Sequence, residues 1–384
     1  MKWKGMLSLL IIAILSLTGC WNYKDVNQMI IVSGAAIDSA KGKPGYHITA
    51  EVVRPTEEVG LKGEIYESDG QTIFEAIRDL IIEASKKPSW AHSKVLLIGE
   101  EAAKKGTTPF LDMMYRDAEV RRDMWLFIAE EETAGEVLQT DVGKIGQVRS
   151  YYIEDIIKAE DSVTRFHGVR LWEYIKYQYA EGVSPTMPLI RVVPVGKGKM
   201  YQVAGTAVFK DDKLVGKLNE RETRSYAWII DEIGGGLINV DTNIDGEFAE
   251  IALEIFNSSS KMEPFYQDGK LSMRITVEEI IVNIAEIDGH TDVIDKMNRG
   301  ELEKDAADLV RQDIKDVVKK VQKEYGSDIF GFGRAVKRHM PDIWKEIRED
   351  WDKIFPIMDV EVDVKVKIRG SALHNKPLKA GGGI

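Results

Sequence analysis

The sequence predicts a multi-domain protein of mixed α/β and α+β class, with about three domains. Up to about residue 190, short apolar runs alternate with segments of helical periodicity, which is typical of a sheet covered by helices. Further on, strand-like segments are separated by long helical stripes, which favours an α+β layer structure. A length of 384 residues fits two or three domains.

The first twenty residues have the layout of a secretory signal. Two lysines near the start precede an apolar run from Leu7 to Leu17, and small residues then lead to a cysteine. The segment Leu17, Thr18, Gly19 and Cys20 resembles the bacterial lipobox. Cys20 is the only cysteine in the chain, so it has no intramolecular disulfide partner. We expect residues 1–19 to be a lipoprotein signal peptide and Cys20 to carry S-diacylglycerol and N-acyl groups.

An uncleaved membrane anchor and a buried core helix are the alternatives for this segment. The apolar run is eleven residues long, whereas a spanning helix needs about 20. A core helix would not usually follow two lysines at the extreme N-terminus. Several acyl chains on one residue give stable anchoring. We therefore expect a folded body tethered to the outer leaflet of a cytoplasmic membrane.

A mixed α/β domain is expected over residues 20–195. Residues 29–38 and 46–53 predict strands joined by a turn that contains glycine and proline. A helix with its apolar residues on one face follows, ending at Pro88. Further elements are expected as buried strands at 95–98 and 125–129, and as helices after residue 100, at 154–160 and at 169–180.

Residues 196–233 predict a small middle unit made of a β-hairpin and a helix. The segments 204–209 and 213–216 flank a turn at Lys210-Asp211-Asp212, and the helix runs from Asn219 to about Ile230. The glycines that follow, Gly234 to Gly236, are the best candidate for a flexible joint.

The C-terminal domain, residues 234–372, is expected to be an antiparallel sheet covered by long helices. Strands at 248–256 and 271–277 precede an apolar helical stripe that runs from Leu302 to Tyr325. Residues 358–369 alternate strictly between apolar and charged side chains, which predicts one buried face and favours antiparallel pairing. Trp344 and Trp351 are expected in the core, with an exposed partner-binding patch as the alternative. Residues 373–384 are expected to be a flexible tail.

The sequence predicts no catalytic, cofactor or metal site. No two of the six histidines lie within a helical turn of each other, and no zinc-type spacing occurs. The clusters Gly331-Phe332-Gly333 and 196–199 lack the remainder of a nucleotide-binding motif, so both are interpreted as turns. The acidic groups at 130–132 and 349–350 lack the spacing of a calcium loop. A net charge of −11 argues against nucleic-acid binding.

Several segments resemble the Ger(x)C lipoproteins, the C subunits of spore germinant receptors. They include 19–26, 31–38 and 205–216. The most specific block is Asp328-Ile329-Phe330-Gly331-Phe332-Gly333, and it is followed by Pro341, Trp344 and 351–356. Asn22 stands where family members often have Asp, a departure that does not affect the predicted lipid site.

This resemblance implies a lipid-anchored, non-enzymatic subunit on the outer face of the spore inner membrane. It implies action with two polytopic membrane subunits, A and B, in nutrient-triggered germination, and a three-domain α/β fold without cofactors. The small-molecule germinant is expected to be bound by the complex rather than by this subunit alone. Cys20 is the one residue to which the resemblance assigns a chemical role. A substrate-binding lipoprotein of a transporter and a surface hydrolase are the alternatives; the first would need two similar lobes, and the second lacks its motifs.

Overall fold

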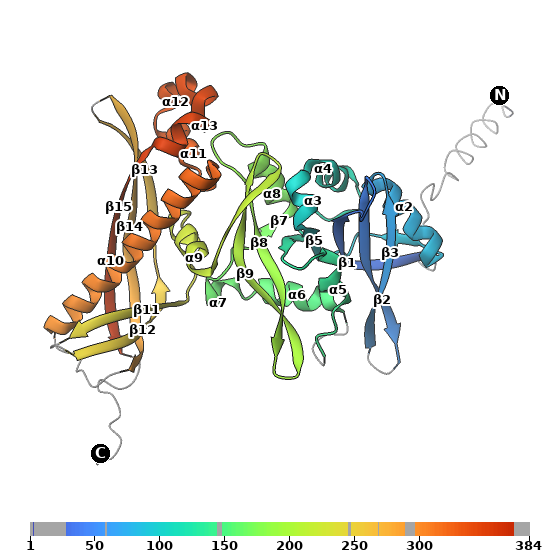
Figure 1. Cartoon of the computed structure of the whole chain (residues 1–384), viewed down its shortest axis with the longest axis horizontal. Coiled ribbons are helices and arrows are strands. Elements are labelled where there is room, and N and C mark those ends of the chain that lie inside the picture. Colours follow the sequence, from blue (N-terminus) through green and yellow to red (C-terminus); the bar gives the residue numbers. More distant parts are fainter. Residues whose placement is uncertain are drawn as a thin grey trace, which may run out of the picture.

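The structure, a computed structural model, describes residue 3 and residues 28–57, 60–143, 148–244, 247–267, 269–288 and 296–371. These residues form an elongated molecule in which two sheets follow one another along the long axis (Figure 1). The predicted lipobox, Leu17 to Gly19 with Cys20, and the predicted tail at 373–384 lie outside the described residues.

The larger sheet has a parallel centre and an antiparallel hairpin at each edge. Its strand order is β10-β9-β8-β6-β5-β1-β2-β3, with β4 beside β1 and β7 beside β6. The pairs β1–β5, β5–β6 and β6–β8 are parallel. The strands are β1 (Met29–Ser39), β2 (Tyr46–Thr56), β3 (Gly60–Gly70), β4 (Lys87–Ser89), β5 (Val95–Gly99), β6 (Trp125–Ala129), β7 (Val169–Arg170), β8 (Thr186–Val195), β9 (Gly198–Lys210) and β10 (Lys213–Leu218).

Helices cover both faces of this sheet, as the alternating pattern predicts. Leu96 on β5 belongs to a core that includes Phe110 and Tyr174, whereas its neighbour Leu97 belongs to a core that includes Val137. Successive strand residues point to opposite faces, so these are two separate cores. The helices are α2 (Ile73–Ala84), α3 (Glu100–Lys105), α4 (Thr108–Arg116), α5 (Ala134–Gln139), α6 (Arg149–Ile157), α7 (Glu160–Val163) and α8 (Leu171–Gln178).

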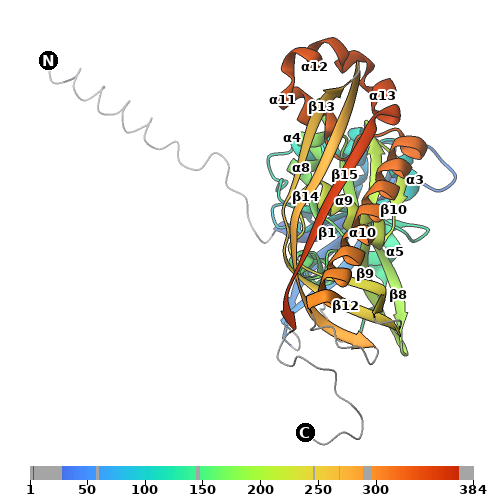
Figure 2. The ribbon, with the colours of Figure 1, turned by 90° about the vertical axis from the view of Figure 1, so that its left-hand side faces the viewer.

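The second sheet has the order β11-β12-β14-β13, with β15 also paired to β14, and the long helix α10 covers one of its faces (Figure 2). The strands are β11 (Leu237–Ile244), β12 (Glu247–Asn257), β13 (Ser260–Gln267), β14 (Lys270–Asp288) and β15 (Asp359–Ser371). Helix α10 (Lys296–Lys320) continues into the π-helical turn η2 (Val321–Tyr325). The apolar stripe predicted on this helix is confirmed, since these residues are buried: Leu302, Ala306, Val310, Ile314, Val317 and Val321.

Short helices link α10 to β15. They are α11 (Phe332–His339), α12 (Pro341–Ile347), η3 (Arg348–Asp350), α13 (Trp351–Ile354) and η4 (Phe355–Ile357). Trp344, Trp351 and Phe355 are buried, which confirms the core interpretation and excludes the exposed tryptophan patch.

The direction of β15 differs from the prediction. Its alternating side chains do bury one face, but it pairs in parallel with β14, from Ser272 opposite Asp359 to Ile284 opposite Ser371. Alternation shows that a strand has one buried face and carries no information about the direction of its neighbour. Parallel pairing needs a long crossover, and the helices from α10 to η4 supply it.

The predicted middle unit is not separate from the larger sheet. Strand β9 pairs with β8 in antiparallel fashion, and β10 completes the edge. The sequence did not predict β8 because proline is rare inside strands; Pro188 lies at a shift in the register of β8 and β9. Helix α9 (Glu220–Ile229) then buries Tyr226 and Trp228 in the core of the second sheet.

Candidate functional site

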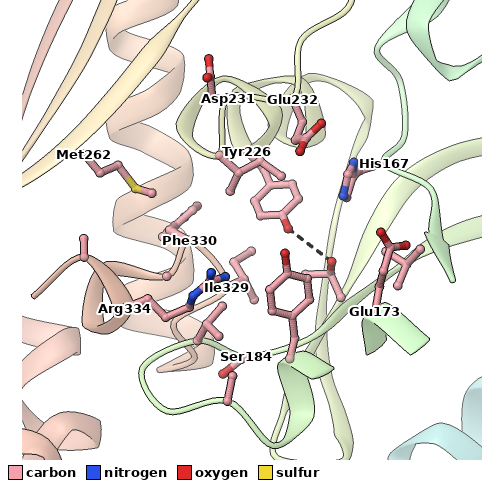
Figure 3. Close-up of a pocket in the computed structure, with 18 of the residues that line it drawn as sticks. His167, Glu173, Ser184, Tyr226, Asp231, Glu232, Met262, Ile329, Phe330 and Arg334 are labelled. Carbon is pink, nitrogen blue, oxygen red and sulfur yellow. Dashed lines mark hydrogen bonds between the residues drawn. The ribbon is translucent and has the colours of Figure 1, made fainter. Parts of the chain in front are cut away.

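A cleft of about 1000 Å³ lies where the two sheets meet. Its walls come from segments that are far apart in the chain: the region around α8, the end of α9, and the stretch from Ile329 to Arg338 (Figure 3). Met262 on β13 adds an apolar side chain at one edge.

One wall of the cleft is acidic. His167 Nδ1 lies 2.9 Å from Glu160 Oε1. Burial lowers the pKa of His167, but the hydrogen bond to Glu160 and the charges of Glu232 and Glu173 outweigh burial, so this pKa lies above its ordinary value. Burial also raises the pKa of Glu232, and the charge of His167 only partly offsets it. This wall favours a cationic group.

The facing wall is basic. The Arg334 guanidinium lies over the Tyr177 ring, 5.4 Å from its centroid, and makes no ion pair with any described residue. Arg338 lines the same side, while Lys337 is paired with Glu181 at 2.8 Å. The cleft therefore places an unpaired guanidinium opposite a carboxylate wall, an arrangement suited to binding small molecules that carry both charges.

The geometry supports binding better than catalysis. A histidine paired with a carboxylate resembles half of a hydrolytic triad, but no described hydroxyl or thiol hydrogen-bonds to His167. Tyr226 donates to or accepts from Thr186 at 3.3 Å instead. Within the described ranges, no group of three or more His, Cys, Asp or Glu residues is placed to hold a metal ion.

Asp328 organises the segment beside the cleft. Its carboxylate accepts hydrogen bonds from the backbone N–H groups of Gly331, Phe332 and Gly333, at 2.9, 3.0 and 2.8 Å, and from Trp351 Nε1 at 3.1 Å. Burial raises the pKa of Asp328 to about 6 despite these donors. The cluster predicted as a turn is therefore the first turn of α11, held by a buried carboxylate.

The same segment joins the two halves of the molecule. The Arg334 N–H donates to the Gly182 carbonyl at 3.0 Å, and the Ser184 N–H donates to the Asp328 carbonyl at 2.7 Å. A Cβ on Gly333 would lie 2.5 Å from the Gly182 Cα, so only glycine allows this approach. We call this contact between residues 181–184 and 328–334 the latch.

The remaining glycine and acidic clusters have structural roles. Residues 196–199 lie at the turn between β8 and β9. Glu130 pairs with Arg191 and Lys217, and Glu132 pairs with Lys41. At the predicted joint, Thr164 donates to the Gly235 carbonyl and Ile255 to the Gly236 carbonyl.

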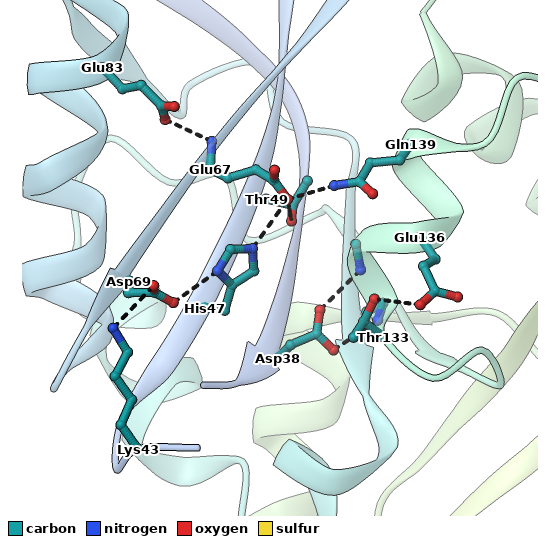
Figure 4. A network of polar contacts seen from close by, with 12 residues as sticks. Asp38, Lys43, His47, Thr49, Glu67, Asp69, Glu83, Thr133, Glu136 and Gln139 are labelled. Atoms are coloured by element: carbon teal, nitrogen blue, oxygen red, sulfur yellow. Dashed lines mark hydrogen bonds and ion pairs between the residues drawn. The ribbon is translucent and has the colours of Figure 1, made fainter. Parts of the chain in front are cut away.

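A second polar network lies on the larger sheet, away from the cleft (Figure 4). His47 Nδ1 is 2.9 Å from Asp69 and Nε2 is 3.2 Å from Glu67. Burial lowers the pKa of His47, but these two carboxylates outweigh it and raise the pKa above 6.5. Nearby, the buried Asp38 accepts from the Ala134 and Gly135 N–H groups at the start of α5. These groups anchor helix and strand ends.

Asp328 belongs to the motif singled out in the sequence, where it was given no role. The residues of the cleft were not predicted from the sequence. The motif itself was the available signal, because a carboxylate three residues before a glycine-rich turn can cap a helix. No local signal marks His167, Glu232 and Arg334 as neighbours, since they are brought together only by the packing of the two sheets.

Two family models match the chain almost end to end. A model described as "Spore germination protein N-terminal domain" matches residues 22–192, and one described as "Spore germination B3/ GerAC like, C-terminal" matches residues 204–372. The chain belongs to the Ger(x)C family of spore germination proteins. Residues 328–334 and Trp344 lie within the second of these matches, and residues 181–184 lie within the first.

This Ger(x)C chain aligns with several relatives over nearly their whole length. It is 27% identical to "Spore germination protein B3" of Bacillus subtilis (strain 168), covering 96% of this chain and 98% of the relative. It is 24% identical to "Spore germination protein KC" of the same organism, covering 97% and 96%. The "Crystal Structure of the GerBC protein" aligns with a TM-score of 0.56 at 24% identity, covering 88% of this chain and 97% of that chain. This likeness supports the mixed α+β fold.

Proposed function

We propose that this protein is the lipid-anchored, non-enzymatic C subunit of a spore germinant receptor. It acts with polytopic A and B membrane subunits on the outer face of the spore inner membrane, and takes part in nutrient-triggered germination. The observation that carries this proposal is the end-to-end similarity to spore germination proteins, which spans both family models and nearly the whole length of the relatives.

The anchor in this proposal is a lipid on Cys20. The basic start, the apolar run and the sequence Leu17-Thr18-Gly19-Cys20 support it. No helix among the described residues has the length and apolarity needed to cross a bilayer. Replacing Cys20 by alanine should abolish both acylation and cleavage after Gly19, which mass spectrometry of the N-terminal peptide can follow.

The test of partnership is an affinity purification from dormant spores. The chain carries a tag after Gly381, the inner membranes are solubilised in mild detergent, and co-purifying proteins are identified by mass spectrometry. Recovery of two polytopic membrane proteins would support a receptor subunit. Recovery of a permease and an ATPase would favour a transporter-associated binding protein instead. The Cys20→Ala chain is the control for capture that depends on membrane attachment.

The cleft is a candidate ligand-binding site on the same subunit. Unlike the two similar lobes of transporter-associated binding proteins, the sheets on either side of this cleft differ in strand order and direction. That difference favours the receptor subunit over the transporter candidate. A thermal-shift panel of amino acids and sugars checks for binding, since a ligand at a hundredfold excess over its Kd stabilises the folded protein by about 2.7 kcal/mol.

A further inference from the structure

Helix α2 has a second apolar side that no described part of the chain covers. Its packed side buries four residues against the larger sheet, yet on the outer side Ile82 is 80% exposed and Phe74 is 51% exposed. Ile77 and Ile81 lie beside Phe74 and Ile82 on the helix surface and are half-buried. A surface helix normally has one apolar stripe, which faces the core, so exposed apolar residues on a second side are suited to further burial. The packed residues are Ile73, Ala76, Leu80 and Ala84.

The basic and acidic residues of α2 lie on different lines along the helix. Arg78 lies between Phe74 and Ile82, with its guanidinium 4.9 Å from the Phe74 ring centroid. The carboxylate of Glu75 instead accepts from the Gln71 N–H at 2.8 Å, and that of Glu83 from the Glu67 N–H at 3.0 Å. Positions 75, 79 and 83 form a separate acidic stripe on the helix. The outer side of α2, defined as Phe74, Arg78 and Ile82, is thus apolar and cationic.

The pairing of β4 with β1 places the end of this helix beside the start of β1. Immediately after α2, Lys87 on β4 lies opposite Met29, the first residue of β1. Cys20 precedes Met29 by nine residues, a segment that spans at most about 30 Å when fully extended. In Figure 1, α2 lies at the end of the long axis farthest from the second sheet. A lipid on Cys20 therefore holds α2, rather than the second sheet, near the membrane.

We propose that the outer side of α2 lies on the lipid surface, with Phe74 and Ile82 among the acyl chains and Arg78 at the phosphate level. This inference rests on the lipid anchor of the proposed function. Helices that lie in the interface combine aromatic and aliphatic side chains with basic residues in this way. The exposed Lys86, two residues after the end of the helix, adds a further positive charge close to it. The membrane contact would point the cleft and the second sheet away from the bilayer.

The test uses site-specific labels on the full chain, produced in a host that processes lipoproteins. Cys20 is then blocked by its lipid, so an environment-sensitive fluorophore reacts only with an introduced cysteine. We would label Ile82→Cys and Phe74→Cys, with Ile357→Cys, an exposed position in the second half of the chain, as the matched control. Each protein is reconstituted into vesicles of phosphatidylglycerol and phosphatidylethanolamine, with and without lipids that carry a quencher in the acyl chain.

The inference predicts that labels at positions 82 and 74 shift to the blue and lose most of their emission to the lipid quencher, while the label at 357 does neither. Co-flotation with the vesicles without quenching at 82 and 74 would overturn it, leave the anchor intact and assign the outer side of α2 to a protein partner. Equal quenching at all three positions would also overturn it. A chain that does not float, with a free thiol at Cys20, would contradict the anchor itself.

Discussion

At the scale of single residues, the family motif around Asp328 is explained by one carboxylate. Four N–H donors converge on it, three from the backbone at the start of α11 and one from Trp351. The glycines on either side serve this arrangement. Gly331 has a φ of 79°, which favours glycine, and Gly333 leaves room for Gly182. The conformation of this segment thus depends on one buried carboxyl group.

Replacing Asp328 by alanine should strongly destabilise the protein. The substitution leaves buried N–H donors without an acceptor, and each unsatisfied donor lowers the free energy of unfolding by about 1–3 kcal/mol. The pKa of Asp328 is raised from 3.8 to about 6 on folding, so its contribution to stability falls as the pH rises through that interval. The loss caused by alanine should therefore be larger below pH 6 than above it. Urea unfolding at one pH below 6 and one pH above it measures this difference in stability, with the exposed Asp352→Ala as the control. Equal stability of the two variants would refute the argument.

The pKa of His47 provides a second test at this scale. Because Asp69 and Glu67 raise it above 6.5, protonated His47 stabilises the fold below that pH, and this contribution is lost as the pH rises through the folded-state pKa. In the Asp69→Asn variant the pKa of His47 should fall. An NMR titration of the imidazole protons follows this change. Asp155→Asn, an exposed carboxylate elsewhere, is the matched control, and an unchanged His47 titration in Asp69→Asn would contradict the assignment.

At the scale of elements, the sequence predicted those with strong periodicity and missed strands that contain mixed polar residues or a proline. The α10 stripe, the β1–β2 hairpin and the buried strands β5 and β6 were predicted correctly. Strands β3 and β13 were missed because edge strands carry mixed polar residues and, in β13, a proline at position 264. The direction of β15 could not be predicted, since alternation reflects burial and direction depends on the distant partner β14.

The α10 stripe gives a prediction for this element. Ile314 is fully buried against the second sheet, so Ile314→Ala should lower the free energy of unfolding by about 2–5 kcal/mol through lost burial and an unfilled cavity. The exposed neighbour Lys315→Ala should change it by about 0.5 kcal/mol or less. Urea denaturation monitored by tryptophan fluorescence compares them. Similar midpoints for both variants would mean that α10 does not form the core of this half.

At the scale of the whole molecule, long-range packing forms the cleft and the contacts between the two halves, which local sequence patterns cannot predict. The contacts that join the halves include the latch, the Arg221–Asp313 pair and the Lys320–Glu222 pair. The cleft lies between them, so its residues belong to segments that only the assembled fold brings together. The sequence motif marked the latch, but the charges that face each other across the cleft have no signature in the chain.

The latch leads to a prediction about the arrangement of the two halves. In Gly333→Ala the new Cβ would meet the Gly182 backbone at 2.5 Å and the Trp344 ring at 2.9 Å, so the two segments must separate. We expect a larger maximum dimension in solution scattering, faster proteolysis near residues 179–185 and a lower melting temperature. Gly300→Ala is the matched control: it lies in α10, its Cβ would meet no atom within 4 Å, and alanine favours the helix by about 1 kcal/mol. If Gly333→Ala keeps the scattering profile and proteolysis pattern of Gly300→Ala, the latch does not hold the halves together, and their arrangement depends on the two ion pairs and the packing of α9.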